Sequence, residues 1–103
     1  MFGRVSRYHG EPGRTEEAFA APSSRELQEA PGFLGAYALV DHKTGNAMTI
    51  TLWETEEAML DSVELADRLR QQISDDVGGT EPPTYEMYEV VSQPEVVPIP
   101  ERR

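Results

Sequence analysis

The chain has 103 residues, of which 19 are acidic and 9 are basic, so its formal net charge at pH 7 is −10. This length predicts one domain with one modest core. The negative charge repels phosphate backbones and anionic lipids, which excludes nucleic acid and membrane surfaces as partners. Cysteine is absent, which excludes disulfide frameworks, thiolate zinc sites and thiol nucleophiles and fits a reducing compartment.

The sequence shows no targeting or membrane-spanning segment. No apolar run approaches the about 20 residues that a membrane span requires, and residues 1–14 lack the apolar core of a signal peptide. We therefore expect a cytoplasmic domain.

The first part of the chain predicts a strand followed by a broken helix. Residues 2–8 are rich in aromatic and β-branched types, and Gly and Pro residues follow them. Thr15 precedes two glutamates that suit a helix N-terminus. Pro22 then interrupts the helix, and Ser23 with Glu26 forms a capping box for a second short helix that ends before a Pro-Gly pair.

The next two elements predict a hairpin. Residues 33–40 form a nearly continuous apolar run, and residues 48–53 alternate large apolar residues with threonine, so both are expected strands. Residues 41–46 between them have turn composition, with Gly45 suited to a positive φ. The two strands are expected to pair antiparallel.

The second half predicts one helix and one strand. Thr55 is the expected cap of the helix, which the Gly78-Gly79 pair ends. Residues 84–91 form the last expected strand. One face of the helix gathers apolar side chains at helical spacing: Met59, Val63, Ala66, Leu69 and Ile73.

The order strand, helix, strand, strand, helix, strand predicts a ferredoxin-like βαββαβ fold of the α+β class. We expect a four-stranded antiparallel sheet with the helices on one face, in a single domain of residues 1–92. The two central strands, the first and the third, are expected to be the exception and to run parallel. Residues 93–103 are rich in proline and are expected to form an extended C-terminal arm.

The uncovered face of this sheet predicts a homodimer. Alternate residues of the third strand point to opposite faces, either Met48, Ile50 and Leu52 or Thr49, Thr51 and Trp53. Either set leaves apolar side chains on the face away from the helices, so a second copy should cover that face. The arm at 93–103 could reach across to that copy, and its deletion should then weaken the dimer.

Several short segments together resemble the antibiotic biosynthesis monooxygenase-like family of dimeric α+β barrels. The resemblance spans residues 2–92 and implies a cofactor-independent monooxygenase acting on a small aromatic or polyketide-like molecule. The alternative is a non-catalytic homodimeric domain that binds a small apolar ligand or serves as a scaffold. The segments are Pro31-Gly32-Phe33, the threonine-rich strand that ends in Trp53-Glu54, Glu56-Glu57-Ala58 and Tyr88-Glu89-Val90-Val91.

The predicted ligand site follows from the parallel central pair. Strands that run parallel would bring Tyr8 and His9 to the same edge as Trp53, beside the start of both helices. The resemblance implies that Trp53 lines a substrate cavity, although a lone tryptophan is as readily a core residue. The candidate substrate-binding residues are Trp53, Thr51, Thr49, Tyr8, Phe33 and Tyr37.

His9 is the candidate catalytic base, because an imidazole can accept a proton near neutral pH; the alternative is a partly exposed strand end. His42 is expected at the opposite edge, so we predict no metal shared by the two histidines. Three arginines, Arg4, Arg7 and Arg14, make the N-terminal segment basic, which fits either an anionic substrate or pairing with acids.

We predict no cofactor, heme included. The resemblance places the axial histidine of the heme-degrading branch at the position that Val63 occupies. The chain has no histidine after Trp53 and no asparagine on its first expected strand.

Overall fold

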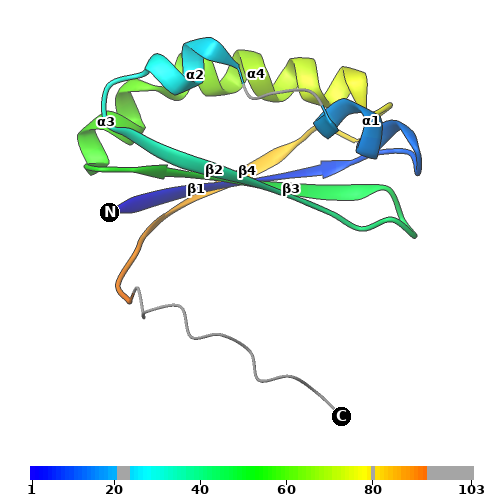
Figure 1. Ribbon diagram of the computed structural model, residues 1–103, viewed down its shortest axis with the longest axis horizontal. Coiled ribbons are helices and arrows are strands. Elements are labelled where there is room, and N and C mark those ends of the chain that lie inside the picture. Colours follow the sequence, from blue (N-terminus) through cyan, green and yellow to red (C-terminus); the bar gives the residue numbers. More distant parts are fainter. Residues whose placement is uncertain (21–23, 80, 93–103) are drawn as a thin grey trace.

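The computed structural model describes residues 1–20, 24–79 and 81–92. Four strands and four helices lie in this part of the chain (Figure 1). In chain order they are β1 (Phe2–His9), α1 (Arg14–Ala20), α2 (Arg25–Glu29), β2 (Phe33–Val40), β3 (Asn46–Trp53), α3 (Glu56–Asp61), α4 (Val63–Asp76) and β4 (Thr84–Glu89). The arm expected at 93–103 lies outside the described residues.

The four strands form one sheet in the order β2-β3-β1-β4, and each neighbouring pair is antiparallel. The expected parallel pairing of β1 with β3 is therefore wrong. The crossover through α1 and α2 makes β1 parallel to β2, and the hairpin reverses the chain, so β3 runs opposite to both. As a result Trp53 lies opposite Phe2, and His9 lies opposite Asn46 at the other end of the sheet.

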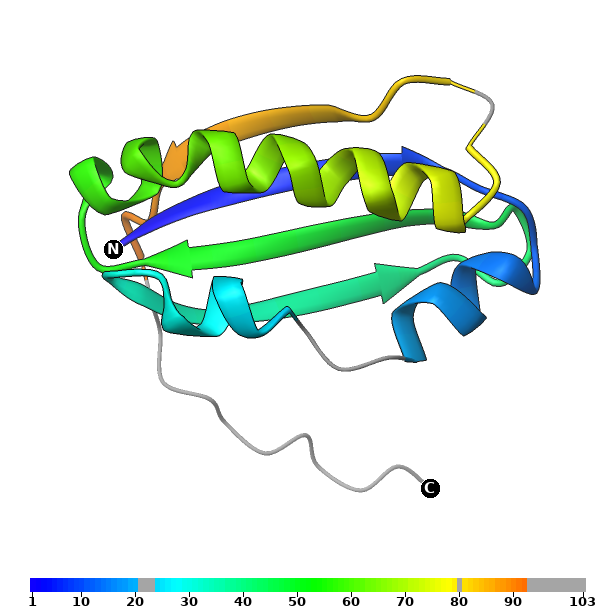
Figure 2. The same cartoon turned by 90° about the horizontal axis from the view of Figure 1, so that it is seen from above.

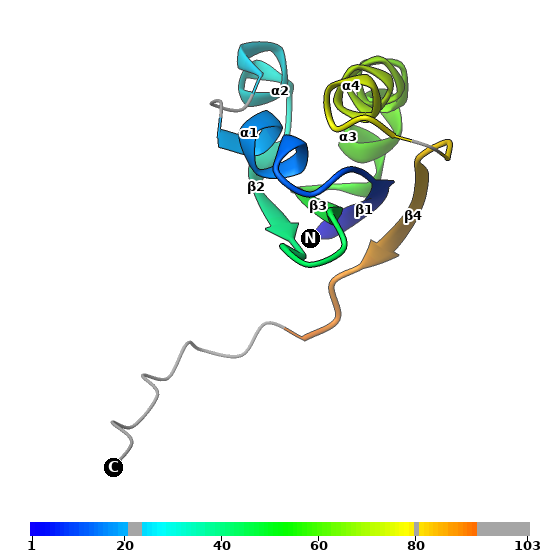
Figure 3. The ribbon, with the colours of Figure 1, turned by 90° about the vertical axis from the view of Figure 1, so that its right-hand side faces the viewer.

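All four helices cover the same face of the sheet, as Figures 1 and 3 show. Helices α1 and α2 contact β2, whereas α4 contacts β1 (Figure 2). This arrangement is the expected ferredoxin-like α+β fold. Within the described residues, no helix is long and apolar enough to cross a membrane.

The strand register decides which side chains face the helices. In an antiparallel pair, residues directly opposite each other share a face. Arg4 lies opposite Thr51, Ser6 opposite Thr49, and Tyr8 opposite Ala47. Arg4, Ser6 and Tyr8 are buried beneath the helices, so the threonines and Trp53 point toward the helix layer. The alternate set on β3, namely Met48, Ile50 and Leu52, faces away from it.

The helix signals in the sequence are largely confirmed. The first helix is broken into α1 and α2, although Ser23 lies outside the described residues and Ser24 is the N-cap of α2. Thr55 caps α3 by accepting a hydrogen bond from the backbone N–H of Ala58 over 3.0 Å. The single helix expected after it is divided at Ser62 into α3 and α4.

The β2–β3 hairpin is fixed to the start of α1. Gly45 has the expected positive φ of 80°. The fully buried Thr15 donates its hydroxyl to the carbonyl of Gly45 over 2.6 Å. A Cβ on Gly45 would lie 2.5 Å from the nitrogen of Pro12, so only glycine permits this close approach.

Candidate functional site

A cavity of about 330 Å³ lies between the sheet and the helix layer. This volume is near the lower end of the range for small-molecule pockets, roughly 300–1,000 Å³. The strands β1, β2 and β3 form its floor, and α1, α2 and α4 form its walls. Its apolar lining consists of Ala18, Phe19, Leu27, Ala36, Ala38, Ala66, Leu69 and Ile73.

Polar side chains are concentrated on the floor of the cavity because strand alternation presents one set of residues there. Strand β1 contributes Arg4, Ser6 and Tyr8, and β3 contributes Thr49 and Thr51. Helix α4 adds Arg70 from above. The cavity therefore combines apolar walls with hydroxyl and guanidinium donors.

Arg4 connects the floor of the cavity to the break between α3 and α4. Its Nη2 donates to the carbonyl oxygen of Met59 over 2.5 Å and to Oγ of Ser62 over 3.1 Å. The Arg4 residue is 2% exposed. Burial lowers the pKa of the guanidinium, and the nearby positive charge of Arg70 lowers it further.

Arg70 lies on the buried face of α4 and is 5% exposed. Its Nη2 donates to the Asp67 carboxylate one turn earlier. Its guanidinium also lies over the ring of Tyr85 on β4, with Cζ 4.0 Å from the ring centroid, which is a favourable cation–π distance.

Tyr8 supplies a neutral phenol to the cavity. Burial raises its pKa, an effect that its hydrogen bond with Thr49 and the charge of Arg70 partly offset. Its ring packs edge-on against Phe19 of α1 with centroids 6.1 Å apart. At neutral pH the hydroxyl therefore remains protonated and can donate a hydrogen bond.

The structure brings some of the predicted site residues together and separates others. Thr49, Thr51 and Tyr8 all line the cavity. Tyr37 contributes to its edge, but it pairs with Ile50 and is 63% exposed, so most of this residue lies on the uncovered face. Phe33 lies opposite Trp53 at the far end of the sheet.

Trp53 is fully buried next to the cavity and is not part of its lining. Its ring packs edge-on against Phe33 with centroids 5.4 Å apart, and Cζ of Arg4 lies 5.7 Å from its centroid. Its indole N–H donates to Oγ1 of Thr51 over 3.0 Å. Trp53 thus contacts the cavity through Thr51 and Arg4.

His9 lies at the opposite end of the sheet from Trp53, because β1 and β3 are antiparallel. The expected meeting of Tyr8, His9 and Trp53 at one edge is therefore wrong. The start of α1 accompanies His9 at one end, and the start of α3 accompanies Trp53 at the other, so the two helix starts do not meet either.

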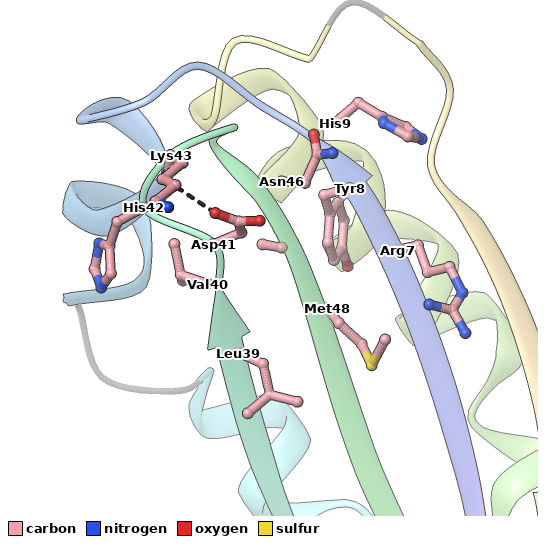
Figure 4. A pocket seen from close by; sticks show the side chains of 11 residues that line it. Arg7, Tyr8, His9, Leu39, Val40, Asp41, His42, Lys43, Asn46 and Met48 are labelled. Atoms are coloured by element: carbon pink, nitrogen blue, oxygen red, sulfur yellow. Dashed lines mark hydrogen bonds between the residues drawn. The ribbon is translucent and has the colours of Figure 1, made fainter.

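His9 and His42 line one broad depression at the hairpin end, on the face away from the helices (Figure 4). The expectation that they lie at opposite edges is wrong as well. Their rings point away from each other in Figure 4, and each has a separate acidic neighbour: Nε2 of His9 lies 3.6 Å from Glu81, and Nδ1 of His42 lies 2.9 Å from Glu16. Among the described residues, no group of three His, Cys, Asp or Glu side chains could hold a metal ion.

Arg70 is one of several lining residues that sequence reasoning missed, as are Ser6 and Asp76. The expected apolar face of the helix was traced through Ala66, Leu69 and Ile73, and Arg70 lies within this stripe, four residues after Ala66. A cation inside an apolar helical stripe is the signal that could have identified it.

No protein-family model matches the chain. The chain is 35% identical over 66 residues to two uncharacterized proteins of Mycobacterium tuberculosis, MT2634 of strain CDC 1551 and Rv2557 of strain H37Rv. The match covers 64% of this chain but only 29% of the length of each relative.

Solved structures with the same fold include several monooxygenases. A monooxygenase of Streptomyces coelicolor, ActVA-Orf6 in complex with nanaomycin D, has a TM-score of 0.71 at 19% identity, covering 95% of this chain and 92% of that one. SnoaB, a cofactor-independent oxygenase from Streptomyces nogalater, has a TM-score of 0.60 at 20% identity, covering 89% and 94%. MhuD with two manganese protoporphyrin IX molecules per active site has a TM-score of 0.68 at 21% identity, covering 93% and 100%.

These similarities define the class of fold. The chain has the fold of the antibiotic biosynthesis monooxygenases, and the resemblance expected from the sequence is confirmed at that level.

Proposed function

We propose that the chain is a cofactor-independent monooxygenase that acts on a small aromatic or polyketide-like molecule held between the sheet and the helices. The observation that carries the proposal is the cavity of about 330 Å³, which lies between the two layers of the monooxygenase fold and is lined by apolar walls and hydrogen-bond donors. Thr49, Thr51 and Tyr8 are the proposed substrate contacts.

The reaction requires a substrate that donates an electron to dioxygen once it is deprotonated. When a phenol becomes a quinone in this way, one oxygen atom of dioxygen enters the product. The second oxygen atom leaves as water with the two hydrogens that the phenol loses. No metal is needed because the substrate anion itself supplies the electrons.

The cavity supports this chemistry by orienting the substrate. The apolar walls would hold the ring, and the hydroxyls of Tyr8, Thr49 and Thr51 would fix its oxygen atoms. Asp76 is the one carboxylate among the described residues that line the cavity, and it is exposed. The substrate proton would therefore leave toward solvent.

A second copy of the chain is the proposed cover of the uncovered sheet face. Large side chains of the described residues are exposed there: Tyr37 is 63% exposed, Leu39 51% and Tyr88 50%. Met48, Ile50 and Leu52 lie beside them and are only partly buried. An apolar face of this kind is typical of an interface between identical subunits.

Oxygen uptake tests the proposed function. The protein is incubated with a panel of phenols, quinols and naphthols under oxygen, and dioxygen consumption is followed together with the incorporation of labelled oxygen into the product. Ala66→Leu should abolish uptake, because Ala66 is only 8% exposed and lines the cavity, so the larger side chain would fill it. The exposed Ala20 at the end of α1 provides the control Ala20→Leu, which should leave uptake unchanged.

Binding without uptake would contradict the monooxygenase proposal. If panel members bind to the wild type but not to Ala66→Leu, and none consumes dioxygen, the chain is instead a non-catalytic domain that binds a small ligand.

A further inference from the structure

We propose that the cavity selects the anionic form of its ligand, namely an aromatic molecule whose oxyanion lies between the guanidinium groups of Arg4 and Arg70. Two kinds of ligand carry such an oxyanion on an aromatic ring: a phenolate and an aromatic carboxylate. The proposal rests on the proposed function only in that both use the same cavity.

The first observation is that Arg4 is buried and has no anionic hydrogen-bond partner among the described residues. Its hydrogen bonds go to two uncharged oxygens, the carbonyl of Met59 and the hydroxyl of Ser62. A buried charge is unfavourable unless an opposite charge accompanies it. An anionic ligand would supply that charge.

The second observation is that both guanidiniums retain unused donors. Nε of Arg4 and Nη1 of Arg70 are buried and have no hydrogen-bond partner in the described part of the chain. Both residues line the cavity. Buried N–H groups without an acceptor are rare in proteins, and a ligand oxygen in the cavity would provide the acceptor.

The third observation is that the surrounding groups leave the positive charge largely uncompensated. The titratable groups that interact with the Arg4 guanidinium are Arg70, Tyr85 and Asp67, and Tyr8 interacts with Arg70. The described residues that line the cavity include one carboxylate, the exposed Asp76. Asp67 is the only carboxylate in the set above, and its side chain is 58% exposed. Water therefore weakens its effect on the cavity.

The negative net charge of the molecule distinguishes this site from the rest of the protein surface. The chain carries a net charge of −10, so its surface repels anions. The pair of cations, Arg4 on the sheet and Arg70 on α4, is a local exception, next to the apolar side chains of Leu69 and Ile73. A compact aromatic anion satisfies both features, whereas a neutral ring satisfies only the apolar one.

Binding of matched probes tests the proposal without any turnover. The anionic probes are 4-nitrophenol, whose phenolate absorbs visible light, and 1-naphthoate; their neutral counterparts are nitrobenzene and naphthalene. We expect the wild type to bind each anion at least about tenfold more tightly than its neutral counterpart, as one buried charge-assisted hydrogen bond would give. Added protein should also raise the visible phenolate absorbance of 4-nitrophenol near its ionisation midpoint.

Variants at Arg70 assign the preference to the guanidinium. Arg70→Met keeps much of the aliphatic stem and should abolish the preference for anions, whereas Arg70→Lys should retain part of it. Arg25→Met is the matched control, because Arg25 is 89% exposed and pairs with Glu29 on its own helix; it should behave as the wild type. Arg70→Gln serves in place of Arg70→Met if circular dichroism shows that the latter is unfolded.

Two results would overturn the proposal: equal affinity of the wild type for anions and their neutral counterparts, or an unchanged preference in the folded Arg70 variants. Anion preference without oxygen uptake would sink the monooxygenase and leave this inference intact. Oxygen uptake without anion preference would support the monooxygenase and overturn this inference. The anion that binds more tightly, phenolate or carboxylate, identifies the source of the oxyanion.

Discussion

The indole N–H of Trp53 donates to Oγ1 of Thr51 over 3.0 Å. This bond links a fully buried ring to a residue that lines the cavity. Trp53 therefore acts on the cavity through the hydroxyl that it orients and through the nearby Arg4 guanidinium. This indirect role of Trp53 differs from direct contact with a ligand, and substitutions at Trp53 and Thr51 can distinguish the two roles.

Trp53→Phe should lower the free energy of unfolding by about 1–3 kcal/mol, because the smaller ring leaves a void in a fully buried site. Thr51→Val should have an effect of similar size, about 1–3 kcal/mol, because it leaves the buried indole N–H without an acceptor. Urea unfolding measures both effects. Thr84→Val on the exposed surface of β4 is the control and should change stability by less than about 0.5 kcal/mol.

The double variant checks whether the hydrogen bond couples the two residues. In the Trp53→Phe background no indole N–H remains, so Thr51→Val should be clearly less destabilising than in the wild type. Strict additivity of the two substitutions would show that the bond contributes nothing.

Glu16→Gln should make stability less dependent on pH in the acid range. The hydrogen bond with His42, and to a smaller extent that from the backbone N–H of Gly13, lowers the pKa of Glu16 from its ordinary value of 4.5. A carboxyl whose pKa is lowered by folding stabilises the protein above its unfolded pKa, and this stabilisation is lost as the pH falls through the folded pKa. The wild type should therefore be more stable than Glu16→Gln at neutral pH, and the difference should vanish well below pH 4.5.

Thermal unfolding at several pH values measures this difference. Glu17→Gln is the matched control, because Glu17 is the exposed neighbour on the same helix. A stability difference at Glu16 that persists unchanged into strong acid would contradict the assigned role of the carboxylate.

Leu39→Asp should convert the expected homodimer into a monomer. Leu39 is 51% exposed on the face of the sheet that the helices leave uncovered, and a buried charge at a subunit interface is strongly unfavourable. Leu60→Asp is the control, because Leu60 is similarly exposed but lies on α3 in the helix layer. Sedimentation at micromolar concentration distinguishes the species, and a monomeric wild type would refute the proposed interface.

The sequence predicted the fold well because its signals are local. The hydrophobic run at 33–40, the turn around Gly45 and the cap at Thr55 each specify their own element, and all three agree with the structure. The division of the second helix at Ser62 was not predicted. The hydroxyl of Ser62 donates to the carbonyl of Met59 over 2.7 Å and accepts from Arg4, and this long-range partner is invisible in a periodic pattern.

The candidate site was predicted less well because it depends on strand direction. Side-chain alternation correctly grouped Thr49 with Thr51, but the direction of β1 relative to β3 decides whether Trp53 meets His9 or Phe2. The crossover from β1 to β2 and the hairpin from β2 to β3 together fix that direction. The prediction used the crossover without the reversal at the hairpin, so it placed His9 at the same end of the sheet as Trp53. Arg70 was missed because the helix was read only for its apolar residues.

Methyl NMR of isoleucine tests the central claim most directly, because the two isoleucines in the described residues lie on opposite sides of the sheet, Ile73 on α4 and Ile50 on β3. Ile73 lines the cavity, and Ile50 lies on the uncovered face. On titration with 1-naphthoate, the Ile73 methyl signal should shift in a saturable manner while the Ile50 signal remains in place, with Ile→Val variants supplying the assignments. A saturable shift of Ile50 with Ile73 unchanged would place the ligand on the open sheet face and contradict the account.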